Sequence, residues 1–284
     1  VLRLAVPAGR KLADAQAELE RLMPGAAVSA DNLHFASGAA KGIMPMALQA
    51  TTGPIATPVG VIDGGVSAAQ KVLAIRGFAQ GAPMPSHHGS AVVSLLSFAG
   101  VRNIRVADVY GADPAGGNAL AIARALGWLV TQGSKVVNVS LVGPPNALVE
   151  RAIVNAQAKG VKVVAAVGND GPAAPPAYPA SYDGVVAVTA VDRRNRALIE
   201  AGRALHLDYA APGADIRGPN AKGKKVALRG TSFASPLVAA RLAAAVDSGR
   251  SWRRQLDHEA RDLGQPGPDS SYGRGLVCGA CRPR

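Results

Sequence analysis

The sequence predicts an α/β fold, with a mostly parallel β-sheet between two layers of helices and a small strand-helix-strand segment before it. Of the 284 residues, 48% are hydrophobic and 4% aromatic, and 33 are glycine. This composition suits a closely packed core and excludes a disordered or collagen-like chain. Short Val-rich runs also alternate with stretches of helical periodicity. Apolar strands joined by helical crossovers are typical of a parallel sheet buried on both faces.

The N-terminal region carries its own pattern. Residues 2–6 alternate like a strand, residues 12–23 place Leu and Ala at helical spacing, and residues 27–35 indicate a second strand. The stretch 36–57 is rich in Gly, Ala, Thr and Pro, which is typical of a linker. We therefore predict four parts: a strand-helix-strand region at 1–35, a linker at 36–57, the main domain at 58–277 and a C-terminal tail at 278–284.

The main domain shows alternating strands and helices. Helices are expected after Asn118 and Asn146, whose side chains suit helix N-caps. Functional groups of such sheets gather at the carboxyl ends of the strands, where Asp63 and Asn169 lie. The expected buried strands are 60–63, 104–109, 135–141, 161–167 and 185–191.

Charge and cysteine content restrict the partners. The formal net charge is +12, which permits binding to nucleic acid or an anionic membrane surface. The basic residues are scattered and do not alternate with aromatic ones, so we expect no nucleic-acid partner. No apolar run is long enough to span a bilayer. Cys278 and Cys281 form a C-x-x-C pair without the further ligands of a zinc site. A short-range disulfide in an oxidising compartment and two free thiols both remain open.

Three polar residues stand at positions suited to chemistry. Ser232, within 230–236 (GTSFASP), begins an apolar helix, where a free backbone N–H and the helix dipole favour an oxyanion. His88 also begins a helix, and Asp63 ends a buried strand. Each has an ordinary interpretation by itself, as a capping serine, a surface histidine and a turn-capping or cation-binding carboxylate. Together they match a nucleophile, the base that activates it and the carboxylate that orients the base.

Eight ordered segments resemble the subtilisin-like serine proteases (the subtilase family, peptidase family S8), in their compact bacterial type. GVIDGGV at 60–66, HGSAVVSL at 88–95 and GTSFASP at 230–236 resemble the aspartate, histidine and serine motifs. The resemblance covers residues 57–277. The other matching segments are NVSL at 138–141, AAVGNDG at 165–171, YPASYDGVVAVTAVD at 178–192, YAAPG at 209–213 and YGRGLV at 272–277.

The resemblance implies a serine endopeptidase that hydrolyses peptide bonds through an acyl-enzyme on Ser232. His88 would act as general base and acid, Asp63 would orient His88, and Asn169 would join the Ser232 N–H in the oxyanion hole. The runner-up is a catalytically silent binding module, which is disfavoured because the triad and Asn169 are all present. The implied substrate-binding residues are Ser140, Leu141, Val142 and Ala177, with a preference for small to medium apolar side chains.

The sequence also departs from the family. Gly64 stands where relatives carry Ser or Thr, so a water or another donor must hold the Asp63 carboxylate. Val142 replaces a usual Gly beside the specificity pocket. The loop 98–105 is short and poor in oxygen ligands, so we expect no metal of that kind and no cofactor.

The resemblance also bears on partners and location. Residues 1–35 resemble a shortened pro-segment, and a structural strand-helix-strand appendage that stays attached is the alternative. The expected partners are therefore protein or peptide substrates and the chain's own N-terminal segment. The family resemblance implies an extracytoplasmic location, periplasmic or secreted.

Overall fold

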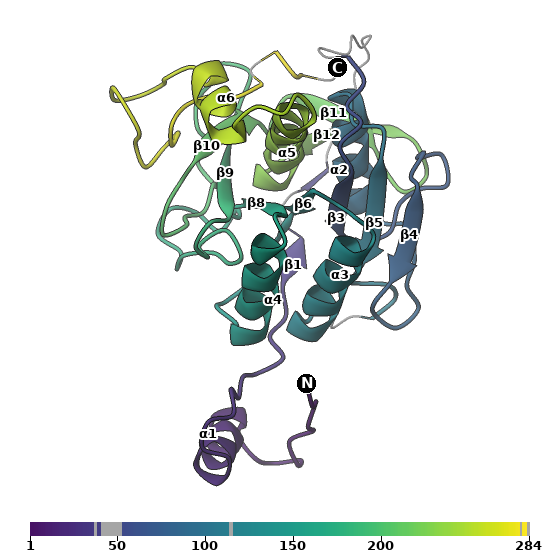
Figure 1. Cartoon of the computed structure of the whole chain (residues 1–284), viewed down its shortest axis with the longest axis vertical. Coiled ribbons are helices and arrows are strands. Elements are labelled where there is room, and N and C mark those ends of the chain that lie inside the picture. Colours follow the sequence, from purple (N-terminus) through teal and green to yellow (C-terminus); the bar gives the residue numbers. More distant parts are fainter. Residues whose placement is uncertain (37–38, 41–52, 114–115, 279, 283–284) are drawn as a thin grey trace.

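A seven-stranded sheet forms the centre of the computed structural model, which describes residues 1–36, 39–40, 53–113, 116–278 and 280–282 (Figure 1). Neighbouring strands all run parallel, which confirms the predicted fold class. The strand order is β10 (Tyr209–Pro212), β9 (Val186–Val191), β8 (Lys162–Ala166), β6 (Val136–Val139), β3 (Val59–Asp63), β5 (Ile104–Asp108) and β4 (Ala74–Gly77).

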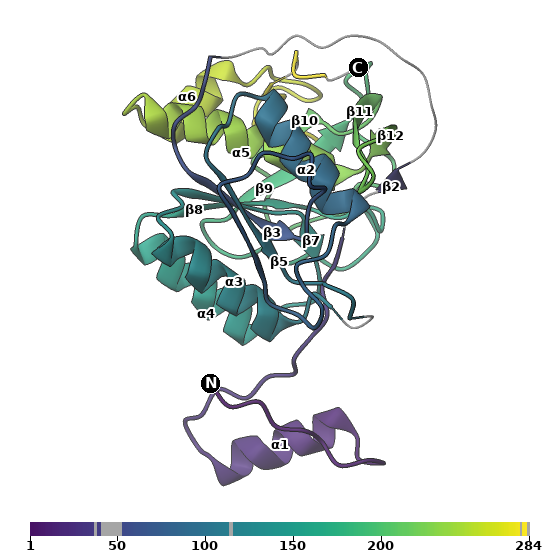
Figure 2. The ribbon, with the colours of Figure 1, turned by 90° about the vertical axis from the view of Figure 1, so that its right-hand side faces the viewer.

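Helices cover both faces of this sheet (Figure 2). On one face lie α3 (Ala119–Thr131) and α4 (Ala147–Ala158), and on the other α2 (His87–Phe98) and α5 (Thr231–Asp247). Strand β3 shows how one apolar run serves both layers, because successive side chains of a strand point to opposite faces. Val61 belongs to the α2–α5 core and Ile62 to the α3–α4 core, and neither is exposed to solvent.

Helix ends follow the predicted caps. Asn118 Oδ1 accepts a hydrogen bond from Ala121 N at 2.9 Å, and Asn146 Oδ1 accepts one from Leu148 N at 3.0 Å. Both asparagines therefore satisfy backbone donors that the first turn of the helix leaves free. The remaining elements are α6 (Trp252–Glu259) and an antiparallel sheet of β11 (Ile216–Pro219), β12 (Lys225–Arg229) and β2 (Ala39–Ala40).

Two cysteines near the C-terminus pack against the main body. Cys278 and Cys281 are joined by a disulfide, so the structure selects the first of the two alternatives that the sequence left open. Both cysteines are buried and belong to the core on the α5 side of the sheet. Among the described residues, no helix has the length and apolarity needed to cross a membrane.

The N-terminal region differs from the strand-helix-strand prediction. The helix is present as α1 (Leu12–Leu22) and stands apart from the main body in both views. The strand predicted at 2–6 is wrong: this stretch is extended but unpaired, and Leu2 remains 88% exposed. No strand of the described residues pairs with 2–6, so their alternation buries no face there. Of the strand predicted at 27–35, β1 (Phe35–Ala36) and a single bridge at Leu33 form. Most of the predicted linker 36–57 lies outside the described residues.

Candidate active site

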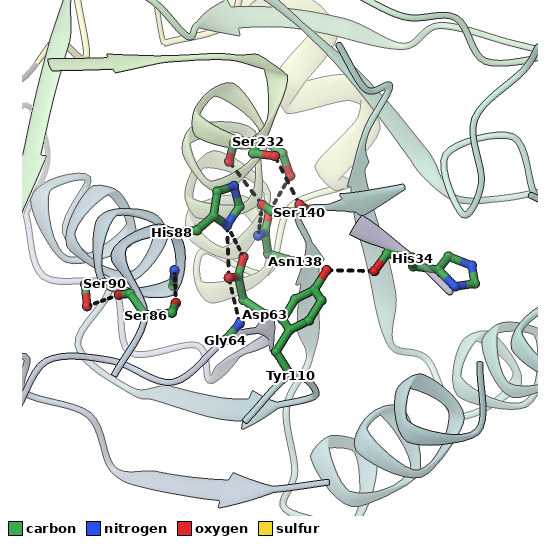
Figure 3. A network of polar contacts seen from close by, with 12 residues as sticks. His34, Asp63, Gly64, Ser86, His88, Ser90, Tyr110, Asn138, Ser140 and Ser232 are labelled. Carbon is green, nitrogen blue, oxygen red and sulfur yellow. Dashed lines mark hydrogen bonds and ion pairs between the residues drawn. The ribbon is translucent and has the colours of Figure 1, made fainter. Parts of the chain in front are cut away.

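Asp63 and His88 meet at the carboxyl edge of the sheet (Figure 3). Asp63 is the last residue of β3, and His88 is the second residue of α2. The imidazole Nδ1 lies 2.9 Å from Asp63 Oδ1 and 2.8 Å from Oδ2. The carboxylate is 1% exposed and the imidazole 12%. Low exposure strengthens this pair, because little water competes for either group.

A backbone group supplies the donor that the sequence left open at Gly64. The Gly64 N–H donates to Asp63 Oδ1 over 2.7 Å. The carboxylate is thus fixed by His88 on one side and by the following peptide on the other. No hydroxyl at position 64 is needed for this contact.

Ser232 lies above the imidazole, on the side opposite Asp63 (Figure 3). It is the second residue of α5, after Gly230 with φ = 143°, a backbone conformation that favours glycine. The Ser232 hydroxyl donates to the Ser140 carbonyl oxygen at 3.0 Å, and the Ser140 hydroxyl donates to the Ser232 carbonyl oxygen at 3.0 Å. These reciprocal bonds hold the start of α5 against the end of β6.

A buried polar chain continues below Ser232. Asn138 Nδ2 donates to Ser140 Oγ at 2.8 Å, and the Ser235 hydroxyl donates to Asn138 Oδ1. All of these side chains are buried. Sequence reasoning missed the role of Ser235, although a serine one helical turn after Ser232, inside an apolar helix, was a visible signal.

Asn169 lies beside the start of α5. It follows β8 by three residues, and its Oδ1 accepts a hydrogen bond from Thr231 N at 3.0 Å. The Thr231 hydroxyl donates to the Gly168 carbonyl oxygen at 3.1 Å. The structure therefore brings Asn169 next to the residue that precedes Ser232.

The expected substrate-binding residues also lie together. Leu141–Val142 form the short strand β7 directly after Ser140. Gly168 lies between two of the predicted side chains: a Cβ on it would be 3.3 Å from Val142 Cγ1 and 3.8 Å from Ala177 Cβ. Val142 and Ala177 thus converge on a glycine next to Asn169. A β-branched residue at 142 narrows this space.

The N-terminal segment, residues 30–40, pairs in part along the edge of β7. Strand β1 pairs with β7 antiparallel, with Phe35 opposite Val142 and Ala36 opposite Leu141. Three residues further on, β2 pairs antiparallel with β12, with Ala39 opposite Arg229. β7 begins right after Ser140, and β12 ends three residues before Ser232. Residues 35–40 are therefore paired with the strand that follows Ser140 and, after a gap at 37–38, with the strand that precedes Ser232 in the sequence.

The same segment has a second row of contacts before β1. His34 N donates to the Gly117 carbonyl oxygen at 2.9 Å, and Ala119 N donates to the Asn32 carbonyl oxygen at 2.9 Å. Asn146 Nδ2 donates to the Ala30 carbonyl oxygen at 2.7 Å. Leu120 N donates to Asp31 Oδ1 at 3.0 Å. The stretch 30–36 thus runs between the start of α3 and β7.

His34 is the buried anchor of this stretch. Its side chain has no exposed surface, and among the described residues neither ring nitrogen has a partner at ordinary hydrogen-bond geometry, although the backbone of Asn32 and of Gly117 lies close enough to favour its charged form. Tyr110 donates its hydroxyl proton to the His34 carbonyl oxygen at 2.9 Å. Burial lowers the pKa of His34 despite the opposing influence of the backbone of Asn32 and Gly117 and of the charge on Asp31. Burial, with the charges of Asp63 and Asp108, raises the pKa of Tyr110.

Metal ligands are not grouped in the described part of the chain: no cluster of three or more His, Cys, Asp or Glu side chains there is placed to hold an ion. The arrangement at Ser232 instead consists of a carboxylate, an imidazole, a hydroxyl and a nearby carboxamide. This set on an α/β sheet is typical of serine hydrolases.

Comparison with known proteins defines the family. The subtilase family model matches residues 57–275. Subtilisin BL of Lederbergia lenta is 34% identical over 241 residues, which cover 77% of this chain and 87% of that protein. Subtilisin E of Bacillus subtilis is 30% identical over 248 residues, covering 77% and 63%. The chain belongs to the subtilase family, and it is a serine endopeptidase.

Solved structures agree with this fold. The prenylagaramide maturation protease PagA superposes with a TM-score of 0.64 at 25% identity, over 78% of this chain and 90% of that one. Fervidolysin from Fervidobacterium pennivorans, a keratinolytic enzyme related to subtilisin, gives a TM-score of 0.69 at 21% identity, over 80% and 42%. At that identity the second match supports the fold alone.

Proposed function

We propose that Ser232 is the nucleophile of this endopeptidase, that His88 is its general base and acid, and that Asp63 orients His88. The observation that carries the proposal is the pair of contacts from His88 Nδ1 to the Asp63 carboxylate at 2.9 and 2.8 Å. With Nδ1–H donated to Asp63, the other ring nitrogen can accept the serine proton once the Ser232 hydroxyl turns from the Ser140 carbonyl oxygen towards it. The carboxylate then stabilises the imidazolium formed as Ser232 attacks the peptide carbonyl.

Asn169 and the Ser232 N–H are proposed to stabilise the oxyanion. Asn169 Oδ1 accepts from Thr231 N at 3.0 Å, which supports an orientation in which the amide nitrogen is directed away from that contact. Ser232 lies in the first turn of α5, where backbone N–H groups have no partner within the helix. Donors preorganised in this way contribute most to catalysis when charge develops on the substrate oxygen.

The first substrate is proposed to be the chain itself. The pairing of Phe35–Ala36 with β7 and of Ala39–Ala40 with β12 supports a cut between Ala36 and Ala39. A substrate held as an added antiparallel strand is bound through its backbone. The same site can therefore bind substrates of many different sequences after the first cleavage. For other protein and peptide substrates, strand β7, including Val142, would bind the backbone beside Ser140. Ala177 would line a pocket for small to medium apolar side chains.

We further propose an extracytoplasmic location. The Cys278–Cys281 disulfide supports it, because disulfides persist in oxidising compartments. Thiol alkylation of the chain directly in intact cells, before and after reduction, tests this point. Complete labelling without a reducing agent would contradict it.

Mass spectrometry tests the catalytic proposal. The unchanged chain, Ser232→Ala and the matched control Ser94→Ala are compared after purification; Ser94 bonds to Ala91 O within α2, away from the site. We expect a cut between Ala36 and Ala39 in the unchanged chain and the control, but not in Ser232→Ala. A serine-directed phosphonate should label the first two and spare both Ser232→Ala and His88→Ala. Labelling that persists in Ser232→Ala would refute the assignment, and an uncut but labelled chain would refute self-cleavage alone.

A further inference from the structure

The geometry points to Ser86 as a positioning residue for the Asp63–His88 pair, an inference that rests on the catalytic roles proposed above. Ser86 would lock the turn after Asp63 to the helix that carries His88. Its side chain occupies the space that a side chain at position 64 would need. The chain would thus have replaced a hydroxyl next to the carboxylate with one on the neighbouring helix.

Ser86 first fixes the start of α2. It is the N-cap residue, and its hydroxyl oxygen accepts a hydrogen bond from Gly89 N at 2.8 Å. A cap of this kind satisfies a backbone donor of the first turn. His88 lies between the cap and the residue that donates to it. The direction in which His88 leaves the helix therefore depends on this contact.

Ser86 also binds the turn after Asp63 directly. The Ser86 N–H donates to the Gly65 carbonyl oxygen at 2.9 Å, and Gly65 and Pro85 form a parallel bridge. Ser90 links the same two parts of the chain. Its hydroxyl donates to the Ser86 carbonyl oxygen at 2.6 Å and accepts from Ser67 N at 2.9 Å. Two hydrogen bonds consequently join the turn to the start of α2, from Ser86 N to Gly65 O and from Ser67 N to Ser90 Oγ. Figure 3 shows the bond between Ser90 and Ser86 beside Gly64.

Steric contact makes Gly64 and Ser86 interdependent. A Cβ on Gly64 would lie 2.5 Å from Ser86 Oγ and 2.7 Å from Ser86 Cβ. Neither distance is tolerated by real side chains. A Cβ on Gly89 would likewise lie 2.2 Å from the Gly64 carbonyl oxygen. The backbone of Gly64 and the backbone of Gly89 therefore pack directly on each other. A side chain that carries a hydroxyl fits at position 64 or at position 86, but not at both.

Ser86 affects the Asp63–His88 pair through one peptide group, the one that joins Asp63 to Gly64. The Gly64 N–H donates to Asp63 Oδ1 at 2.7 Å, and its direction depends on the plane of the 63–64 peptide. Glycine by itself gives a turn many conformations. Ser86, packed against Gly64, restricts those conformations and keeps the N–H aimed at the carboxylate. The carboxylate in turn keeps its two contacts with His88.

Steady-state kinetics on a chromogenic peptide anilide test the inference in the full chain. Ser86→Ala should lower kcat by roughly 10- to 100-fold with KM nearly unchanged, because misaligned catalytic groups slow chemistry rather than binding. The acid limb of the kcat/KM profile should move to lower pH, since a looser carboxylate stabilises the imidazolium less. Ser94→Ala, the same change on the same helix, should do neither.

Position swapping separates positioning from general destabilisation. Gly64→Ser alone should lose more activity than Ser86→Ala. Combining it with Ser86→Gly removes both clashing atoms and retains a tolerated N-cap, so the double variant should regain activity over Gly64→Ser. Equal or lower activity of the double variant would overturn the interdependence. Unchanged kcat and pH profile in both Ser86→Ala and Ser86→Gly would overturn the positioning role.

An activity-independent measurement distinguishes this inference from the proposed function. In the Ser232→Ala chain, the downfield imidazole N–H resonance of His88 reports its hydrogen bond to Asp63. Ser86→Ala should shift or broaden that resonance, and an unchanged resonance would contradict the inference. If the unchanged chain cleaves no peptide, the catalytic proposal fails while this measurement still tests Ser86.

Discussion

Replacing His34 with leucine should make the stretch 30–36 bind more tightly to α3 and β7. His34 is fully buried, and within the described part of the chain its two ring nitrogens make no hydrogen bond of ordinary geometry, the nearby backbone of Asn32 and Gly117 being poorly placed for one. Burying an unpartnered polar group costs about 1–3 kcal/mol in proteins. His34→Leu removes that cost with a side chain of similar size. Since about 1.4 kcal/mol corresponds to a tenfold change, opening of the segment 30–36 should become about 5- to 150-fold rarer.

The same substitution should remove a dependence on pH. Burial lowers the pKa of His34 from its ordinary value of 6.5, to which the residue returns when the segment is released. Because the docked state has the lower pKa, docking has full strength above about pH 6.5 and weakens as the pH falls towards the lowered value. Leucine does not titrate, so the variant should show no such weakening.

Amide hydrogen exchange measures both effects in the Ser232→Ala chain, where the segment stays uncut. Exchange of residues 30–36 is compared with and without His34→Leu at about pH 7.5 and about pH 5.5, after correction for intrinsic exchange rates. The exposed His258 supplies the matched control, His258→Leu. Equal or faster exchange in His34→Leu at both pH values would refute the reasoning, as would corrected exchange of the parent that does not change with pH.

Three further predictions concern catalysis and stability. Asn169→Ala should lower kcat on a peptide anilide by about 10²–10³ with little change in KM; an unchanged kcat would exclude it from the oxyanion hole. Glu259→Gln should lower the free energy of unfolding in urea by about 1–3 kcal/mol. Glu259 pairs with Arg241, their side chains being 22% and 19% exposed, and it accepts a hydrogen bond from Cys278 N. No loss of stability would show that water already screens the pair. Asn118→Ala should cost about 1 kcal/mol of stability as a lost N-cap, whereas Asn155→Ala, at an exposed position inside α4, should cost less; equal losses would contradict the capping argument.

Much of the fold and site followed from local patterns. Apolar runs of strand length, separated by capped helices, predicted a parallel sheet because both of its faces must be buried. Parallel strands end at one edge, so Asp63 after β3 and Asn169 after β8 were expected near each other. His88 and Ser232 were expected there too, because together with Asp63 they match a base, a nucleophile and an orienting carboxylate in the motifs of the subtilase family. The structure brings all four to this edge.

Long-range partners could not be predicted in the same way. The alternation at residues 2–6 and at 27–35 looked alike, yet the first pairs with nothing and the second ends in β1. The difference is that β1 finds β7, more than a hundred residues further along the chain. The contact between Gly64 and Ser86 was also invisible, because it depends on how a helix approaches a turn. Gly64 therefore looked like a missing hydroxyl rather than a position already filled.

The N-terminal segment makes contacts both before and after the proposed cut. Before it, Asn32, His34 and β1 bind the start of α3 and β7. After it, the described residues Ala39 and Ala40 pair with β12. Cleavage converts one tethered strand into two pieces without breaking the contacts before the cut. The N-terminal piece should therefore remain bound to α3 and β7 and inhibit the cut enzyme. Its release would then require a competing peptide or protonation of His34.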